Sequence, residues 1–335
     1  MLTLLAVGAA QARKEFTAMQ FNIWQEGTMV AGGFEAIADE IARHDPDVVM
    51  LSETRNYHNT RFCDRIVAAL AKRGKTYHSF YSYDSGLLSK TEITDSATIY
   101  PVHDDHGTIY RIITTLGGHE AAVYTAHLDY QNGANLEPRG YSGVTWRKMD
   151  KPITNPDTLL YHNNKSFRPA EIRVFMEDAA EQAANGRIVI LGGDFNEPSH
   201  LDWTEATAQM AAHNGVVLKW PTTQLLENGG FVDAYRELHP NPATHPGYTF
   251  PCHNEAVEPL KITWAPESDE RERIDYIVYY PFRGLRAAEA SLVGPRRSVA
   301  YGKPIEETSQ DAFIEPMGVW PTDHKAVLVK FVIED

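Results

Sequence analysis

Acidic, amide and imidazole side chains stand beside apolar segments throughout this 335-residue chain. In "RIVILGGDFNEP" a run of aliphatic residues ends in two glycines, and Asp194 and Asn196 follow at once. Residues of the same kinds accompany other apolar runs: Asn22, Glu53, His127, Asp275, Asp323 and His324. Any one of them could be a turn residue or a satisfied core group. Their repetition predicts that they meet in one polar site.

Carboxylates without thiolates, supported by amides and imidazoles, are typical of a site for a hard cation such as Mg²⁺, with Mn²⁺ or Ca²⁺ as alternatives. Glu53 is the best single candidate for a ligand, because Mg²⁺ takes only one or two protein carboxylates and fills its shell with water and phosphate oxygens. Asp194 could orient or deprotonate a water molecule, and Asn196 could hold that water or a phosphoryl oxygen. Asp275 would fix the tautomer of His324. That imidazole acts either as a general base or, when protonated, as a stabiliser of phosphoryl charge, and the sequence leaves both roles open.

The segments that must position these side chains alternate between two periodicities. Short apolar runs predict buried strands at residues 17–24, 47–51, 109–116, 121–126, 188–191, 274–280 and 325–333. Apolar residues at helical spacing predict amphipathic helices around Phe34–Ile41 and from about Pro169 to Asn185. Strands outnumber helices and residues 101–126 look antiparallel, so we expect a mixed α/β sandwich rather than a purely parallel sheet.

The motifs "FNIW", "LSET", "TAHLDY", "GGDFNEP", "RIDY" and "PTDHKAV" resemble, in order and approximate spacing, those of the endonuclease/exonuclease/phosphatase superfamily. The resemblance extends from about Glu15 to the end of the chain. It implies one catalytic domain, residues 15–335, of the α/β (α+β) class: a four-layer αββα sandwich in which helices flank two packed mixed β-sheets. It also implies a single metal-dependent site that hydrolyses phosphoesters, without choosing the ester.

The same resemblance assigns roles to individual residues. Asn22 and Glu53 match the metal-side pair, and Asp323 matches an aspartate that we place with them at the metal. His127 is similar to a histidine that donates a hydrogen bond to the scissile phosphate or protonates the leaving oxygen. The remaining matches are the catalytic residues Asp194, Asn196, Asp275 and His324.

Residues 129–167 show no convincing periodicity and are locally basic, which favours a lid-like insertion over the substrate. Arg139 and Arg168 are candidates for additional phosphate contacts, because a guanidinium pairs bidentately with phosphate oxygens. A salt-bridged or solvated arginine is the alternative at each position. Tyr141, like Tyr130 and Trp146, would suit a lid over a polar substrate.

Composition limits the function classes. The formal charge of −14 argues against a protein that simply coats nucleic acid, but a nuclease uses only a small part of its surface. Residues 1–14 read as the remnant of a secretory leader, so we expect a secreted or periplasmic protein and otherwise a cytoplasmic one. No stretch is long enough to span a bilayer, and no obligate protein partner is implied. Cys63 and Cys252 are expected to be buried thiols, with one disulfide possible.

Three functions compete at this stage. The first is a metal-dependent phosphodiesterase, with nucleic acid ahead of other diesters as substrate. The second is a hydrolase of small or lipid phosphoesters, such as a sphingomyelinase-like phospholipase C or a sugar or inositol phosphate phosphatase. The third is a non-catalytic binding module on the same fold. That module predicts the loss of Glu53, Asp194 or His324, and all three are present.

Overall fold

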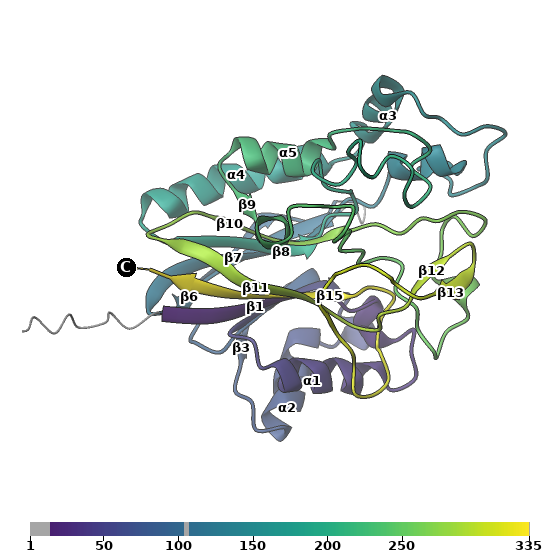
Figure 1. Cartoon of the computed structure of the whole chain (residues 1–335). Helices are drawn as coiled ribbons and strands as arrows, with labels where there is room; N and C mark the ends of the chain where they lie inside the picture. Colours follow the sequence, from purple (N-terminus) through teal and green to yellow (C-terminus); the bar gives the residue numbers. More distant parts are fainter. Residues whose placement is uncertain (1–13, 104–106, 335) are drawn as a thin grey trace, which may run out of the picture.

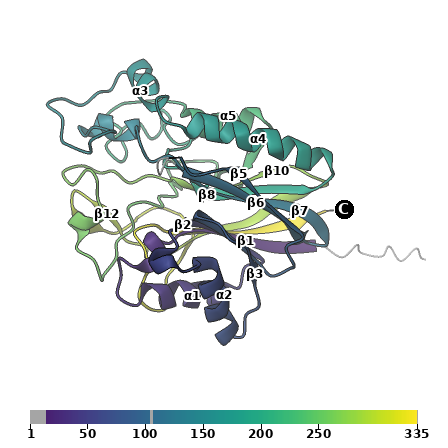
Figure 2. The ribbon, with the colours of Figure 1, turned by 180° about the vertical axis from the view of Figure 1, so that it is seen from behind.

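Two β-sheets pack face to face between layers of helices in the computed structural model, which describes residues 14–103 and 107–334 (Figures 1 and 2). Among these residues the first sheet has the strand order β14-β11-β15-β1-β2-β4-β3. Its strands are β14 (Phe313–Ile314), β11 (Leu285–Val293), β15 (Ala326–Ile333), β1 (Lys14–Asn22), β2 (Val48–Thr54), β4 (Asp84–Ser89) and β3 (His78–Ser79). β1 pairs parallel to β2 and antiparallel to β15, so the sheet is mixed.

The second sheet has the order β5-β6-β7-β8-β10-β9. Its strands are β5 (Asp95–Tyr100), β6 (Gly107–Leu116), β7 (His119–Leu128), β8 (Ile188–Asp194), β10 (Asp275–Tyr280) and β9 (Val232–Asp233). β7 and β8 are parallel, whereas β10 runs antiparallel to β8, so this sheet is mixed too. A separate hairpin pairs β12 (Ser298–Ala300) with β13 (Lys303–Ile305).

Helices cover the outer face of each sheet. α1 (Gly33–His44) and α2 (Phe62–Lys72) lie on the first sheet, and α4 (Arg168–Ala184) and α5 (Pro221–Asn228) lie on the second (Figure 1). Shorter helices sit in the connections: α3 (Pro156–Asn163), α6 (Ala234–Leu238) and the 3₁₀ turns η1 (Gln25–Gly27), η2 (Tyr57–Asn59), η3 (Ala134–Arg139) and η4 (Pro259–Lys261). The expected αββα sandwich is confirmed.

Burial of apolar side chains explains the layers. Side chains of both sheets, such as Phe16, Met50 and Val123, pack together between the sheets. Each of these three residues is at most 3% exposed. Ile37 and Ile41 of α1 face the first sheet, as the helical spacing predicts. All the predicted strands and both predicted helices form, with ends shifted by a few residues.

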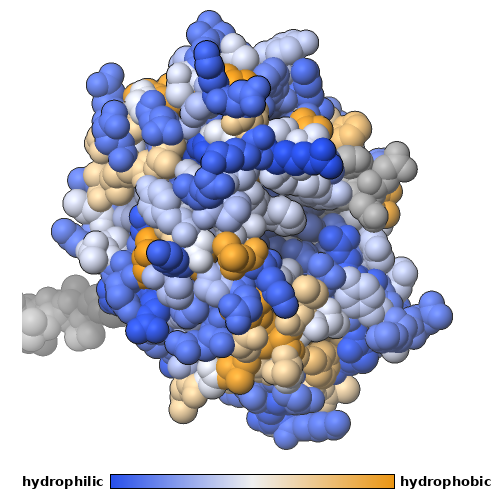
Figure 3. Space-filling model, turned by 90° about the vertical axis from the view of Figure 1, so that its right-hand side faces the viewer, coloured by the Kyte–Doolittle hydropathy of each residue, from blue (hydrophilic) through white to orange (hydrophobic). Residues whose placement is uncertain are grey.

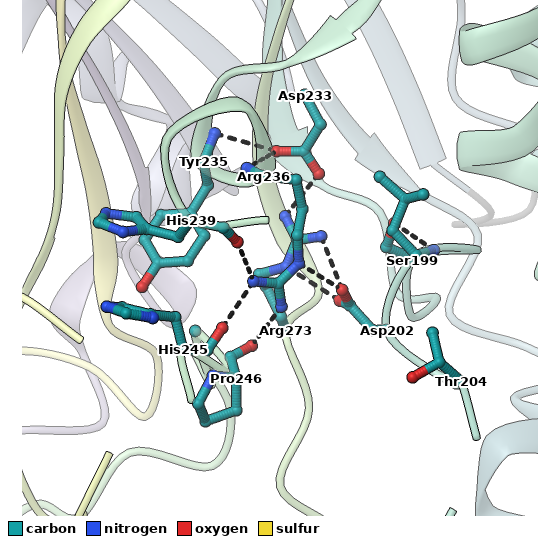
Figure 4. A network of polar contacts seen from close by, with 12 residues as sticks. Ser199, Asp202, Thr204, Asp233, Tyr235, Arg236, His239, His245, Pro246 and Arg273 are labelled. Atoms are coloured by element: carbon teal, nitrogen blue, oxygen red, sulfur yellow. Dashed lines mark hydrogen bonds and ion pairs between the residues drawn. The ribbon is translucent and has the colours of Figure 1, made fainter. Parts of the chain in front are cut away.

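A buried ion-pair network ties α6 to β9, to the connection between β8 and α5, and to the loop before β10 (Figure 4). Asp202 accepts hydrogen bonds from Nε of Arg236 (2.7 Å) and Nε of Arg273 (2.9 Å), and Arg273 also donates to Asp233 (2.7 Å). The other nitrogens of Arg236 donate to the carbonyls of His239, His245 and Pro246. Burial alone would raise the pKa of Asp202, but the two guanidinium groups hold it below its ordinary value. Every charge of this ion-pair network has a partner of opposite sign.

Three further expectations concern the leader, membrane-spanning segments and the two cysteines. The expected leader lies outside the described residues except for Lys14, so export stays a prediction. None of the helices in the described part of the chain is long and apolar enough to cross a membrane. Cys63 and Cys252 are buried free thiols.

Candidate active site

The predicted catalytic and metal-binding residues meet at one end of the two packed sheets, near the carboxyl ends of β1, β2, β7 and β8. Asn22 ends β1 and pairs in register with Ser52 of β2, which places Glu53 beside it. The backbone of Glu53 has φ 73° and that of Asn196 has φ 51°, conformations that side chains rarely adopt. Such strain is concentrated at functional sites, where the surrounding structure enforces it.

In the second sheet, three catalytic candidates form one row across neighbouring strands. Asp194 at the end of β8 pairs in register with His127 on β7 and with Asp275 on β10. Because β10 is antiparallel to β8, its first residue lies beside the last residue of β8. This explains how Asp275, at the start of its apolar run, reaches residues that stand at strand ends.

Neither glycine before Asp194 has room for a side chain: Gly192 packs against the other sheet, and Gly193 packs against β7 of its own sheet. A Cβ atom on Gly192 would lie 2.4 Å from Cε of Met50, and one on Gly193 would lie 2.2 Å from the carbonyl oxygen of Ala126. Ser52 bridges the sheets, since its hydroxyl donates to the Ala126 carbonyl (3.0 Å) and accepts from the Asp194 amide (3.2 Å). Asn22 and Asp194 therefore meet across the sheet interface, where Nδ2 of Asn22 donates to Oδ2 of Asp194 (2.9 Å).

Two imidazoles flank this carboxylate. Nε2 of His127 lies 3.9 Å from Oδ2 of Asp194, and Nε2 of His324 lies 3.8 Å from the same oxygen. The Nδ1 atom of each ring faces a buried carboxylate: Asp84 at 3.0 Å from His127, and Asp275 at 2.9 Å from His324. Asp275 is itself fixed by Nε2 of Gln20 (2.9 Å).

These carboxylates set the protonation of both rings. Burial lowers the pKa of His127, but the Asp84 carboxylate more than compensates and the pKa rises to about 9. Burial likewise opposes the charged form of His324, and Asp275 raises its pKa to about 10. Both imidazoles therefore carry a proton on Nε2 at neutral pH and can donate it to an anion. Burial and the nearby Asp275 raise the pKa of Asp194 to about 6.

A second carboxylate-rich corner adjoins this row. Glu53 accepts hydrogen bonds from Nδ2 of Asn22 (3.2 Å) and the backbone amide of Gln25 (2.9 Å). Burial and the charge of Glu53 raise the pKa of Asp323 to about 7, despite the opposing effect of His324. Two carboxylates that repel one another in this way are stabilised when a hard cation binds between their oxygens.

One further group of possible ligand atoms lies nearby. Asp194, Asp275 and His324 each offer one such atom within 4.8 Å of the others. His324 Nδ1 already hydrogen-bonds to Asp275, so we interpret this group as a hydrogen-bonded catalytic cluster rather than as the cation site.

Sequence comparison gives the family. A sequence model described as the Endonuclease/Exonuclease/phosphatase family matches residues 19–324, a span that contains every site residue described above. The chain belongs to this family. It is therefore a phosphoester hydrolase by class, as its motifs predict.

Individual proteins that are similar to this endonuclease/exonuclease/phosphatase family member share less than a third of its residues. An uncharacterized Caenorhabditis elegans protein, F14F9.5, is 29% identical over 267 residues, which cover 78% of this chain and 77% of that protein. The solved structure of D. rerio TDP2 complexed with single strand DNA product has a TM-score of 0.53 at 17% identity, covering 95% of this chain and 98% of that one. The human nocturnin catalytic domain with bound sulfate has a TM-score of 0.53 at 15% identity, covering 96% and 95%. At these identities the two structures show a shared fold.

The predicted phosphate contacts of two arginines need correction. The side chain of Arg139 is fully buried and donates to Glu272 (2.7 Å) and to backbone carbonyls that include that of Asp269 (2.7 Å). Arg168 is also fully buried and pairs with Glu197. Because their donors are used inside the protein, both arginines stabilise loops and do not face a substrate.

The lid-like insertion is packed rather than structureless. Residues 129–167 contain η3 and α3, and Leu159 of α3 packs with Trp203 and Trp220 in a small apolar cluster. Tyr141 is buried, and its hydroxyl accepts a hydrogen bond from the amide of Glu267 (3.3 Å). Its predicted substrate contact is corrected for that reason.

Three residues of the site were not predicted. Asp84 opens β4 beside His127 and also pairs with Arg55 (3.0 Å), and Gln20 supports Asp275. Asp84 lies in "YSYDSGLLS", where the apolar run is too short to indicate a strand. Gln20 sits inside an apolar strand at an inward position, and such a buried polar residue was the one available signal.

Proposed function

We propose that the protein is a divalent-metal-dependent phosphodiesterase that prefers nucleic acid. One observation carries the proposal: the Asp194 carboxylate lies between two imidazoles, each held by its own carboxylate, which raises the pKa of the ring. This arrangement places a proton acceptor between two proton donors. Hydrolysis of a phosphodiester needs both kinds of group, because water must lose a proton and the leaving oxygen must gain one.

The metal would be held by Glu53, Asn22 and Asp323. The fit rests on the chemistry of these donors, which are hard oxygens, and on the raised pKa of Asp323 beside Glu53. We expect Mg²⁺, and Mn²⁺ or Ca²⁺ would suit the same oxygens. When bound, such an ion polarises a phosphoryl oxygen and offsets charge in the transition state.

The residues of the chain would then divide the proton transfers. Asp194 orients the attacking water and accepts its proton as the new P–O bond forms. Asn196 donates Nδ2 to the Leu128 carbonyl (3.0 Å), which fixes its Oδ1 to hold that water. Nε2 of His324 donates a hydrogen bond to the phosphoryl oxygen that gains charge. Nε2 of His127 donates its proton to the leaving oxygen as the old P–O bond breaks.

A substrate panel tests the proposal. Purified protein would be assayed, with and without EDTA, on plasmid DNA, single-stranded DNA, bis(4-nitrophenyl) phosphate, sphingomyelin and inositol phosphates. We expect hydrolysis of at least one nucleic acid, its loss in EDTA, and its recovery with added Mg²⁺. Asp194→Asn and His324→Ala should lose the activity, and the surface change Asp157→Asn should keep it.

If both site variants hydrolyse the preferred substrate at the parent rate, the mechanism is wrong. If the parent hydrolyses none of these esters in any divalent metal, the protein is a binding module and the proposal is overturned.

A second candidate, a hydrolase of small or lipid phosphoesters, is favoured by one observation. With Arg139 and Arg168 buried, the insertion and the start of α4 offer fewer cations to a polyanion than their sequence indicates, and the whole chain has a charge of −14. Small substrates need no extended basic track. Faster hydrolysis of sphingomyelin or inositol phosphates than of any nucleic acid would decide for this candidate.

A further inference from the structure

Three aromatic rings form a continuous row on the surface beside the site. Tyr130 and Trp146 stack with ring centroids 6.0 Å apart and planes 20° apart, and Trp146 meets Trp264 at 5.4 Å and 37°. Trp264 is 52% exposed and Tyr130 is 38% exposed, whereas Trp203 and Trp220 are buried in the core. We call Tyr130, Trp146 and Trp264 the aromatic platform. Exposed aromatic rings that contact one another form a contiguous apolar patch, and such a patch on a protein surface points to a role in binding.

Both ends of the aromatic platform are attached to strands of the catalytic row. Tyr130 follows His127 by three residues, so their Cα atoms are at most about 10 Å apart. Trp264 lies in the loop before β10, the strand that begins with Asp275. In the same loop Glu272 pairs with Phe250, whose ring centroid lies 4.9 Å from that of His324.

The aromatic platform is held rigidly from below. The buried carboxylate of Glu270 accepts hydrogen bonds from the amides of Trp264 (2.8 Å) and Ala265 (3.0 Å). Trp146 packs on a small apolar cluster of Leu136, Tyr141 and Ala265, so one side of its ring is supported by protein. Rings fixed in this way lose little conformational freedom when a ligand stacks on them.

The surroundings indicate the kind of ligand. Arg147 and Lys151 belong to the same segment as Trp146 and are exposed. Lys148 of this segment is also exposed, but its ammonium pairs with Glu267. Figure 3 looks onto the end of the molecule to which β1 and β8 run, and it shows apolar patches set among hydrophilic surface. Flat rings bordered by a few cations match a flat base joined to a phosphate, and they match a sugar or an acyl chain less well.

We propose that the aromatic platform stacks on an unpaired nucleobase attached to the phosphate that the site cleaves. The inference rests on the proposed phosphodiesterase function and narrows its substrate to esters with an unpaired base, either a single strand or a free nucleotide. A base inside a duplex already stacks on its neighbours, so its face is not available to the rings.

The test measures binding separately from hydrolysis. In an Asp194→Asn background with Mg²⁺, fluorescence anisotropy would give the Kd of a labelled single-stranded octamer and of an octamer of the same length without bases. Competition with unlabelled AMP would give the Kd of a mononucleotide. We expect Trp264→Ala to raise the Kd of the octamer about tenfold and Trp264→Phe to raise it about twofold. The Kd of the base-free octamer should stay within about twofold.

Tyr301→Ala, which removes another exposed ring, is the matched control and should leave every Kd unchanged. If Trp264→Ala weakens binding of both the octamer and AMP, the ligand is the size of a nucleotide. If it weakens binding of the octamer alone, the ligand is a strand. Both results support base stacking. Equal octamer affinity in Trp264→Ala and its parent background, an equal loss for the base-free octamer, or no binding by that background would overturn it. If base-dependent binding is found but active protein cleaves no ester, the catalytic proposal fails and the aromatic platform stands.

Discussion

The ion-pair network around Asp202 and the catalytic row around Asp194 are both buried and both charged, yet they differ in balance. In the network, Asp202 and Asp233 are matched by Arg236 and Arg273. In the site, carboxylates outnumber cations: Asp84, Asp194, Asp275, Asp323 and Glu53 face Arg55, His127 and His324. The difference teaches that buried charges with matched partners stabilise the fold, whereas a buried excess of carboxylates provides a binding site for a cation.

The largest expected effect is on activity. Asp194→Asn removes the proton acceptor of the row, so kcat/KM should fall by about 10³-fold. The free energy of unfolding should not fall. The raised pKa of Asp194 means that burial disfavours its charge, and the substitution replaces that charge with a neutral amide. Steady-state kinetics and urea unfolding of the same preparation check both parts. A loss of stability that matches the loss of activity would remove the distinction between the two regions.

The converse change tests the ion-pair network. Arg236→Met leaves Asp202 with one partner and three carbonyls without a donor, so the free energy of unfolding should fall by about 3 kcal/mol. kcat/KM per folded molecule should stay within about threefold, because this residue lies outside the row. The exposed Arg297→Met is the control and should cost less than about 1 kcal/mol. A similar cost in both variants would contradict the importance of matched burial.

A carboxylate within the site should matter less than Asp194. Asp84→Asn withdraws the charge that raises the pKa of His127 and weakens its orientation, so kcat should fall about 10- to 100-fold with little change in KM. Asp95→Asn, at an exposed carboxylate that pairs with Arg111, is the matched control. If kcat is unchanged, His127 does not depend on Asp84 for catalysis.

The smallest effect concerns Glu171, a buried carboxylate that belongs neither to the ion-pair network nor to the catalytic row. Glu171 on α4 accepts a hydrogen bond from the Asp129 amide (3.1 Å), and burial raises its pKa to about 8. Its folded pKa is above its unfolded one, so the stability it contributes is full below about pH 4.3 and is lost as pH rises through about 8. Glu171→Gln should flatten this decline, as measured by urea unfolding at several pH values. If the free energy of unfolding depends on pH equally in Glu171→Gln and in the parent protein, the pKa of Glu171 is not raised by burial.

Much of the site could be predicted because strand ends are visible in sequence. Each apolar run that carried Asn22, His127 or Asp194 forms a strand, and parallel neighbours bring such residues to one edge. Asp84 was missed because its strand is short and its partner, His127, is 43 residues away. Pairing of this kind depends on tertiary contacts, which a local pattern does not contain.

The arginines show the opposite limit. A basic residue in an irregular segment is usually exposed, and this supported the predicted phosphate contacts of Arg139 and Arg168. Their partners, Glu272 and Glu197, lie 133 and 29 residues away, so nothing near either arginine indicates that it is buried. Sequence charge alone therefore overestimated the basic surface near the site.

The register that aligns His127, Asp194 and Asp275 across three strands has a consequence for how the molecule becomes active. A slip of one residue in any of these strands would turn its side chain to the other face of the sheet. Asn22 comes from the other sheet, and His324 lies just before β15 of that sheet. During refolding, hydrolysis should therefore return only when both sheets are complete, and no partly folded form should cleave its substrate.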